Sequence, residues 1–467
     1  MGLRLLAAGR RDFLILEQAQ RPGGTWRDNR YPGAACDVES LLYSYSFQPK
    51  PDWARDFASQ TEILAYLDDC TARAGLNAHL RCGAEVVEAC YVAASAGWRI
   101  ALADGSTLRC RDLIVATGAL SRPSWPDIPG RESFAGEILH SARWRVDCDP
   151  RGRRVAVIGT GASAIQLVPT LARQAAQLTV FQRTPPWILP RRNRPIPRWR
   201  HALHRSLPWL QSLRRSAIYW QRELHALAMV RQPGWMALAR HAALRHLHAQ
   251  IADPMLRARL EPDYAIGCKR ILLSDDYLPA LTRPQVRLVS TAITGIEAQG
   301  VRTRDGVLHA CDTLVFATGF VTANRAVPLQ ASGRDGIALA ERWMRRPQAY
   351  LGTAMRDFPN LFLLVGPNTG LGHSSMIYMI EAQIALVLRC LAERERRSAR
   401  TIEVHAAAEQ AFNTGLEQRL RRTVWASGCR SWYLNDDGSN STLWPDFTFR
   451  FRARTRDFRS GDWIFGS

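Results

Sequence analysis

Short apolar runs rich in β-branched residues alternate along the chain with segments of helical periodicity. Residues 155–158 form one such run, and the periodic Ile165, Leu167 and Val168 follow before a second run at 178–181. An unbroken apolar run of this length is typical of a parallel strand that is covered on both faces. The pattern therefore predicts an α/β fold. Further runs of this kind lie at residues 13–17, 113–115, 314–316 and 361–365.

The turn after residues 155–158 carries glycines at a spacing that suits a dinucleotide. Gly159, Gly161 and Ala164 follow the order G-x-G-x-x-A between the predicted strand and helix. In that context the first glycine permits the tight turn, the second lets a pyrophosphate approach, and the alanine allows close packing of helix on strand. A glycine-rich turn without a ligand is the alternative. The predicted binding residues are Gly159, Thr160, Gly161, Ala162, Ser163 and Ala164.

The end of the second strand indicates which dinucleotide binds. NAD sites usually place an acidic residue about 20 residues beyond the glycines, where it binds the ribose hydroxyls. Here Arg183 and Thr184 follow the strand instead. A guanidinium can donate two hydrogen bonds to a 2′-phosphate, so NADP(H) is favoured over NAD. A solvated arginine is the alternative interpretation.

The N-terminal residues resemble the second half of another nucleotide-binding unit. Residues 3–7 look like the end of a helix, and residues 13–17 look like a strand that ends in Glu17. Glu17 stands where a ribose-binding carboxylate is expected, but the glycine turn would lie about 20 residues earlier, before Met1. We therefore expect that the first strand and phosphate loop are missing, through an internal start or a truncated gene. An unrelated αβ hairpin is the alternative.

Composition excludes several classes of protein. No apolar run reaches the length of a membrane span, and the ten cysteines show no C-x-x-C pair, so we expect a cytoplasmic protein with reduced thiols and no metal site. The net charge of +20 comes almost wholly from arginine, and Lys50 and Lys269 are the only lysines. We therefore do not predict nucleic-acid binding. Residues 191–260 are helical in composition and rich in Arg, His and Trp, which favours an insertion with solvated arginines over peripheral membrane contact.

The segment before the glycine turn carries a family signature. Phe134, Gly136, His140 and Trp144 form the pattern F-x-G-x-x-x-H-x-x-x-W. This pattern closely resembles the fingerprint of Baeyer–Villiger monooxygenases, which belong to the class B flavin monooxygenases. The family pattern continues with Pro or Asp after the tryptophan, whereas Arg145 stands here.

Other segments resemble the cofactor-binding regions of the same family. The order E…GGTW…NRYPG…CD between residues 17 and 37 resembles its FAD-binding segment, and residues 372–376 resemble a second FAD contact. On their own, Trp26 and Tyr43 could equally be core aromatics. The resemblance implies FAD contacts at Glu17, Gly24, Trp26, Asp37, Tyr43 and Met376, and an NADP or substrate contact at Trp432.

The roles of the short basic pair Lys269–Arg270 are indicated only by the family resemblance. The resemblance implies that Lys269 helps to hold the NADP 2′-phosphate and that Arg270 is the active-site arginine, oriented by Asp37. A permanent cation can stabilise an anionic oxygen intermediate in a dry pocket. The alternative is that Arg270 is simply one of many surface arginines.

The resemblance also implies the domain organisation. A-T-G triplets after the strands at 113–115 and 314–316 mark crossings between two dinucleotide-binding, Rossmann-like domains. We expect a discontinuous FAD domain at 1–142 and 326–467, and an NADP domain at 143–325 with a helical insertion at about 191–260.

The implied activity is an FAD- and NADPH-dependent monooxygenase. Through a flavin C4a-peroxide, such an enzyme inserts one oxygen atom from O₂ into a ketone and gives an ester or lactone. Two alternatives stay open: oxidation of nitrogen or sulfur by a related enzyme, and a truncated NADP-binding remnant without catalysis. The sequence does not identify the ketone or the oligomeric state.

Overall fold

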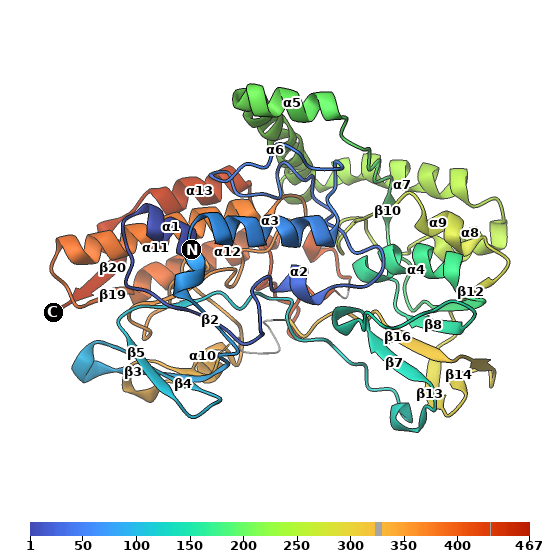
Figure 1. Cartoon of the computed structure of the whole chain (residues 1–467), viewed down its shortest axis with the longest axis horizontal. Helices are drawn as coiled ribbons and strands as arrows, with labels where there is room; N and C mark the ends of the chain where they lie inside the picture. Colours follow the sequence, from blue (N-terminus) through green and yellow to red (C-terminus); the bar gives the residue numbers. More distant parts are fainter. Residues whose placement is uncertain (323–328, 430) are drawn as a thin grey trace.

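The computed structural model describes residues 1–322, 329–429 and 431–467. Figure 1 shows two lobes, each with a parallel sheet unit, and confirms the α/β fold with two dinucleotide-binding-like halves. One lobe is formed mainly by the middle of the chain, and the other is formed by the N-terminal and C-terminal parts together.

The sheet of the middle lobe has five parallel strands in the order β12-β9-β8-β16-β7. The predicted strand–turn–helix–strand unit is confirmed in β8, α4 and β9, and the apolar side chains of β8 are buried. A three-stranded antiparallel sheet, β13-β14-β15, follows β12. The bounds are β7 Glu137–His140, β8 Arg154–Ile158, α4 Ala162–Gln174, β9 Gln177–Phe181, α9 Tyr277–Leu281, β12 Val286–Val289, β13 Ile293–Glu297, β14 Gly300–Thr303, β15 Leu308–Ala310 and β16 Thr313–Phe316.

Strand β7 bears on one expected domain boundary. It pairs in parallel with β16 at the edge of this sheet, with His140 opposite Phe316. The boundary at residue 143 stays a prediction, and because β7 completes this sheet we propose that the middle unit begins before Glu137. The other expected boundary, between 325 and 326, lies outside the described residues.

The parallel strands of the other lobe form two separate pairs. Strand β1 (Ile15–Glu17) pairs with β2 (Leu80–Cys82), and β6 (Leu113–Val115) pairs with β18 (Leu361–Leu363). Both β6 and β16 run into an A-T-G triplet, so β6 corresponds to β16. Strand β1 follows α1 as β9 follows α4, so β1 corresponds to β9. In the middle lobe β8 lies between β9 and β16. Among the described residues, no strand occupies the corresponding place between β1 and β6.

The remainder of this lobe packs helices and a meander around those strands. The C-terminal elements return to the N-terminal ones, because Leu5 of α1 shares a core with Met379 and Leu386 of α11. The bounds are α1 Gly2–Ala7, α2 Thr25–Asp28, α3 Gln60–Arg73, β3 Val86–Val92, β4 Gly97–Leu102, β5 Thr107–Cys110, β17 Ala331–Ser332, α10 Leu339–Trp343, α11 Met376–Arg396, β19 Thr401–Val404, α12 Ala406–Leu420, α13 Thr448–Arg456 and β20 Trp463–Gly466.

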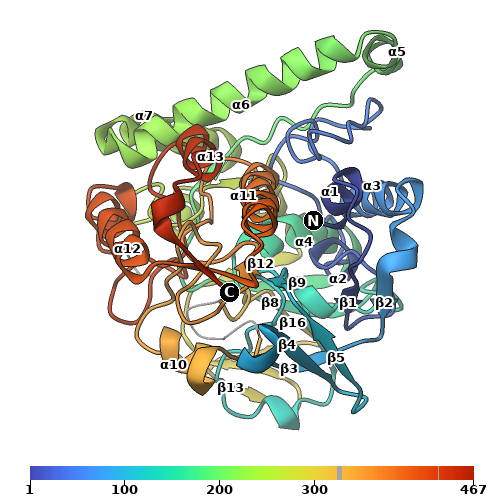
Figure 2. The same ribbon diagram turned by 90° about the vertical axis from the view of Figure 1, so that its left-hand side faces the viewer.

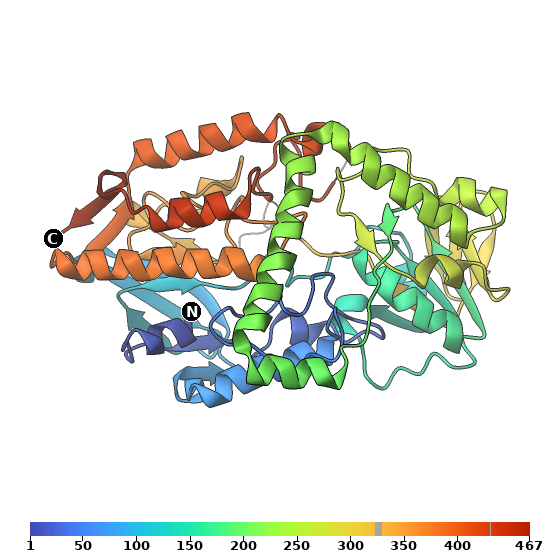
Figure 3. The same cartoon turned by 90° about the horizontal axis from the view of Figure 1, so that it is seen from above.

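The helical insertion predicted at about 191–260 is present. Figures 2 and 3 show α6 lying over α11 and α13 and crossing the outside of the molecule between the two lobes. No helix in the described part of the chain is long and apolar enough to cross a membrane. The bounds are β10 Ile188–Leu189, α5 Arg198–Ser206, α6 Pro208–Val230, α7 Met236–Gln250, α8 Pro254–Leu260 and β11 Leu272–Leu273.

The expectation that the arginines of the insertion are solvated is wrong for α6. Arg215 donates to the Ser44 hydroxyl at 3.2 Å, and Arg222 forms an ion pair with Glu39 at 2.8 Å. Both guanidinium groups therefore point toward the loop that follows α2. Helical periodicity predicts that a helix has two faces, but it does not reveal that the inner face of α6 meets the Glu39 carboxylate.

A buried ion pair fixes α11 to the turn between β5 and β6. Arg394 is almost fully buried and holds Asp112 with both terminal nitrogens, with an Nη2–Oδ2 distance of 2.9 Å. Replacing Asp112 with alanine leaves this guanidinium buried without its partner, so we expect a loss of about 3–5 kcal/mol in the free energy of unfolding. Urea-induced unfolding measures that loss. Asp147→Ala is the control, because its ion pair with Arg145 is exposed and should contribute less than about 1 kcal/mol. Equal losses in the two variants would contradict the assignment.

Candidate active site

An ion pair between Arg270 and Asp37 lies where the two lobes meet. Arg270 Nε and Nη2 both contact Asp37 Oδ2, at 2.8 and 2.7 Å, and the two side chains are 27% and 28% exposed. Arg270 Nη1 donates to the carbonyl of Leu371 at 3.2 Å. The guanidinium therefore joins the loop after α8, the loop after α2 and the turn before α11. The structure thus brings together the two residues proposed as catalytic from the resemblance.

The charges around this pair keep both groups ionised. Burial raises the pKa of Asp37, but Arg270 and then Arg222 outweigh it and hold that pKa below its usual value. The charge of Asp37 raises the pKa of Arg270, against the opposing effect of burial. Arg222 also donates to the Asp37 carbonyl at 3.3 Å, and Arg191 donates to the Cys36 carbonyl at 2.7 Å. Neither contact was predictable from the sequence, since neither arginine lies in a motif.

Tyr433 is a further neighbour of Arg270 that motif reasoning did not single out. Its side chain is buried, and burial raises the pKa of its hydroxyl while the Arg270 guanidinium opposes that rise. The adjacent Trp432, a predicted NADP or substrate contact, is 44% exposed and its ring lies 4.4 Å from that of Tyr433. The segment around residues 431–433 therefore borders the ion pair, with Trp432 free to meet a ligand.

The turn between β8 and α4 has the geometry of a pyrophosphate site. Gly159 has φ +113°, and a Cβ added there would lie 2.5 Å from the Ala317 carbonyl oxygen, so only glycine fits. A Cβ added to Gly161 would meet no atom within 4 Å, which leaves room for a ligand to approach the backbone. Gly161 caps α4 without a side-chain hydrogen bond, and the first turn has no acidic residue. The free N–H groups of Ala162 and Ser163 therefore suit phosphate oxygens.

Neighbouring side chains complete this turn. The Thr160 hydroxyl donates to the Thr184 carbonyl at 3.0 Å and so fixes the loop after β9 beside the glycines. Ala164 is fully buried against the sheet, as the spacing predicts. On the outer side of α4, Gln166 accepts from the Tyr31 hydroxyl at 2.9 Å, which fastens the loop after α2 to this helix.

Two cations lie beside the same turn. Partial burial lowers the pKa of Lys269, and the positive charge of Arg183 lowers it further, with Asp263 opposing. The Lys269 ammonium lies 4.4 Å from the centre of the Tyr264 ring, and Arg183 is exposed. Like charges held together repel each other unless an anion joins them. The pair therefore fits the 2′-phosphate of NADP, so the residues present suit this cofactor.

The residues predicted on the FAD side lie in the lobe formed by the N-terminal and C-terminal parts of the chain. Glu17 accepts from the Ala19 N–H at 2.9 Å and pairs with Arg27 at 2.9 Å. Trp26 Nε1 donates to the Tyr43 hydroxyl at 3.2 Å, and the two rings meet edge to face at 5.5 Å. Gly24 has φ +49° and open space around it. Asp37 is among the charges that act on the Tyr43 hydroxyl, so the Trp26–Tyr43 pair lies near the carboxylate that holds Arg270.

The turn before α11 offers unpaired polar atoms to a ligand. Met376 begins the helix, and Ser375 caps it by accepting from the Ile377 N–H. Ser374 Oγ and His373 Nδ1 are buried and have no hydrogen-bond partner among the described residues. A flavin ring, with its carbonyl and N–H edge, fits such a turn. These atoms concern the flavin end of FAD.

The histidine of the F-x-G-x-x-x-H-x-x-x-W pattern contacts the A-T-G triplet that follows β16. His140 is buried, accepts from the Ala142 N–H at 3.1 Å and lies 3.4 Å from the Thr318 hydroxyl. Burial lowers the pKa of His140, so the ring is neutral near pH 7. Thr318 donates to the Ser124 carbonyl at 2.6 Å. The histidine therefore positions the crossing between the lobes.

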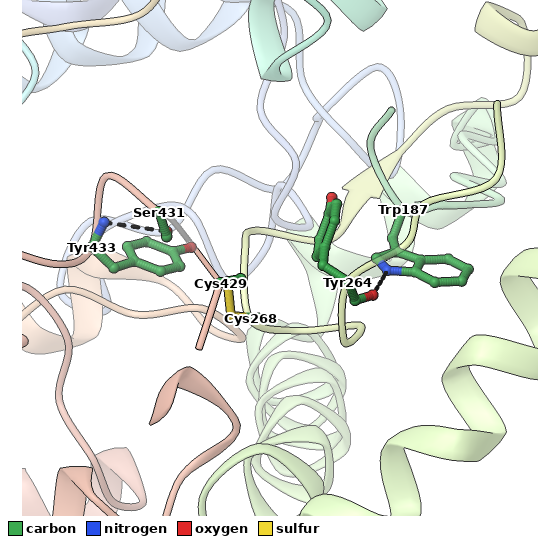
Figure 4. Close-up of a disulfide and its surroundings, with 6 residues drawn as sticks. All are labelled: Trp187, Tyr264, Cys268, Cys429, Ser431 and Tyr433. Carbon is green, nitrogen blue, oxygen red and sulfur yellow. Dashed lines mark hydrogen bonds between the residues drawn. A yellow bond between two sulfur atoms is a disulfide. The ribbon is translucent and has the colours of Figure 1, made fainter. Parts of the chain in front are cut away.

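The expectation of fully reduced cysteines is wrong for one pair. A disulfide joins Cys268 to Cys429, 161 residues apart in sequence (Figure 4). It links the loop segment before Lys269 and Arg270 to the segment before Trp432 and Tyr433. Figure 4 shows it between Tyr264, whose carbonyl accepts from Trp187 Nε1, and the ring of Tyr433. A pairing across such a separation leaves no trace in cysteine spacing.

Removing this disulfide should destabilise the protein strongly. A cross-link that closes a loop of this length restricts the unfolded chain, so Cys429→Ser is expected to lose about 2–5 kcal/mol in unfolding free energy. Reductant should lower the melting temperature of the wild-type protein but leave that of the variant unchanged. Cys82→Ser, which removes a partly exposed free thiol, is the control. A wild-type protein that does not respond to reductant would contradict the prediction.

Comparisons with known proteins agree with this geometry. A family model described as pyridine nucleotide-disulphide oxidoreductase matches residues 1–197. A Baeyer–Villiger monooxygenase of Pseudomonas aeruginosa is 44% identical over 461 residues, which cover 98% of this chain and 87% of the relative. Two solved structures align with 100% of this chain, over 96% of their own chains. One is OTEMO in complex with FAD and NADP, with a TM-score of 0.90 and 27% sequence identity. The other is cyclohexanone monooxygenase from Rhodococcus sp. Phi1 bound to NADP⁺, with a TM-score of 0.88 and 28% sequence identity.

Proposed function

This chain belongs to the Baeyer–Villiger monooxygenase family of flavin-dependent enzymes, and we propose that it inserts one oxygen atom from O₂ into a ketone to give an ester or lactone. The cofactors are FAD and NADPH. The observation that carries the proposal is the Arg270–Asp37 pair, because it joins a permanent, forked cation, next in the chain to Lys269 of the predicted NADP site, to Asp37 of the predicted FAD segment.

FAD, when bound, accepts electrons from NADPH and activates O₂, which no amino-acid side chain does. The residues that would hold its flavin end are Gly24, Trp26, Tyr43 and the turn at Ser374–Met376. The residues that would hold NADPH are the glycine turn at 159–161, together with Arg183, Thr184 and Lys269.

The protein itself contributes charge and position. Arg270 donates forked hydrogen bonds toward negative charge that develops on oxygen during the transfer, and its fixed position avoids reorganisation at that moment. Asp37 orients the guanidinium through two contacts to one carboxylate oxygen. The buried Tyr433 lies beside the Arg270 guanidinium on the side of the C-terminal segment.

The substrate follows from the same chemistry. A small organic ketone carries a carbonyl oxygen that becomes negative on attack, and Arg270 is placed to stabilise it. A related enzyme that oxidises nitrogen or sulfur needs no such oxyanion contact, so this geometry favours the ketone. We further propose that the protein works in the cytoplasm, where NADPH is regenerated.

One preparation tests the proposal. Purified protein that carries a flavin absorbance band should convert a cyclic ketone to a lactone with NADPH and O₂. A thioether offered in parallel should react more slowly. Conversion of the thioether alone would favour the nitrogen- or sulfur-oxidising alternative. Protein that binds NADPH without acquiring the flavin band from added FAD would favour the non-catalytic remnant.

A further inference from the structure

Helix α6 turns its charged side inward and an apolar side outward. Trp209, Leu213, Trp220 and Leu224 are 61%, 61%, 56% and 67% exposed, and their spacing of four, seven and four residues places them along one face. Arg215, Arg222 and Glu223 lie on the opposite face, and each has partners in the rest of the protein. None of the exposed residues from Pro208 to His225 is Arg, Lys, Asp or Glu.

This outer face is large for a surface left in water. Each of the two tryptophans presents on the order of 100 Å² or more at these exposures. The two leucines and the nearby Phe449, whose ring lies 5.8 Å from Trp220, extend the same apolar area. Contiguous apolar patches of several hundred square ångströms on soluble proteins usually mark an interaction site. Figure 3 shows α6 on the outside of the molecule with no element of the chain above it.

The face is symmetric about its own centre. Trp209 and Leu224 lie equally far in sequence from the Ser216–Ala217 pair, and so do Leu213 and Trp220. When two such helices pack antiparallel about a twofold axis, Trp209 of one meets Leu224 of the other and Leu213 meets Trp220. Small residues at the centre allow close approach of the two helices. A twofold interface requires this kind of self-complementarity.

We propose that the outer face of α6 binds the α6 face of a second copy of this chain, in an antiparallel twofold dimer. Lipid is a poorer fit, because helices that lie in a membrane surface carry Lys and Arg on their polar face to meet anionic headgroups. In α6, Arg215 and Arg222 lie on the face opposite the apolar one and are engaged by Ser44 and Glu39. Leaving the apolar face in contact with water is unfavourable, whereas a second copy covers this face with matching side chains.

Sedimentation of the full-length protein, prepared without detergent, tests the dimer. The wild-type chain should sediment as a dimer at micromolar concentration. Leu213→Glu places a carboxylate against Trp220 of the partner twice in each dimer, so it should weaken association by about 30-fold or more. Met344→Glu is the matched control, because Met344 is 78% exposed at the C-cap of α10, away from this face. A monomeric wild-type protein, or a Leu213→Glu variant that remains dimeric, overturns the proposal.

Charge exchange tests the antiparallel register. The double variants Leu213→Glu/Trp220→Glu and Leu213→Arg/Trp220→Arg should each be monomeric. Mixed together they should form a heterodimer, because every glutamate then faces an arginine. Sedimentation of the wild-type protein with vesicles of phosphatidylglycerol completes the test. If the protein were monomeric and bound these vesicles through Trp209 and Trp220, the dimer proposal would be wrong and the face would be a membrane contact.

Discussion

Replacing Arg270 with alanine should lower ketone oxygenation by about 10²–10³-fold, the usual effect of removing a pre-positioned donor to a developing oxyanion. NADPH binding should change little, because the glycine turn and the Arg183–Lys269 pair do not depend on this side chain. The measurement is the rate of lactone formation beside the dissociation constant for NADPH. Arg270→Lys keeps the charge but loses the forked donors, so it should recover only part of the rate.

The control for this experiment is Arg346→Ala. Arg346 is a guanidinium of nearly the same exposure, 28%, and it pairs with Glu417 away from the active site. Its loss should leave oxygenation unchanged. If Arg270→Ala retained full ketone oxygenation, the ion pair with Asp37 would be structural and the proposed mechanism would be wrong.

Local features of the fold were predictable from the sequence, because they depend on neighbours in the chain. The apolar run at 155–158, the glycines at 159 and 161 and the run at 178–181 predicted β8, the turn and β9. Each prediction rests on sterics and burial within about 30 residues, which is the length of one βαβ unit. Gly159 illustrates the point, since its positive φ and its contact with Ala317 both require glycine.

Long-range contacts were predictable only where a motif marked both partners. Asp37 and Arg270 lie far apart in sequence, and the family resemblance paired them before the structure did. Nothing marked Arg222 or Arg191, which hold the backbone of the same loop. The Cys268–Cys429 disulfide and the place of β7 in the middle sheet were missed for the same reason, since each depends on how distant segments pack.

Removing both cations beside the NADP turn should change the choice of cofactor. Arg183→Ala and Lys269→Ala each remove a charged donor from the proposed 2′-phosphate site, and a hydrogen bond to a charged group contributes about 1.5–3 kcal/mol. Each variant should therefore raise the KM for NADPH by about 10- to 100-fold, and the double variant should raise it by 10²-fold or more. The KM for NADH, which lacks that phosphate, should stay nearly constant, so the preference for NADPH should be lost. Steady-state oxidation of the two nucleotides measures both values.

The logic of the double variant lies in the repulsion between the two cations. Arg183 lowers the pKa of Lys269. Removing Arg183 alone should therefore delete one contact to the phosphate and also remove the repulsion that acts on the Lys269 ammonium. The two effects should then combine less than additively, as for residues that share one partner. Arg240→Ala is the control, because Arg240 is an exposed arginine of α7 that faces Glu261. If KM values for NADPH and NADH rose together, the two cations would support the fold of the loop without contacting the 2′-phosphate.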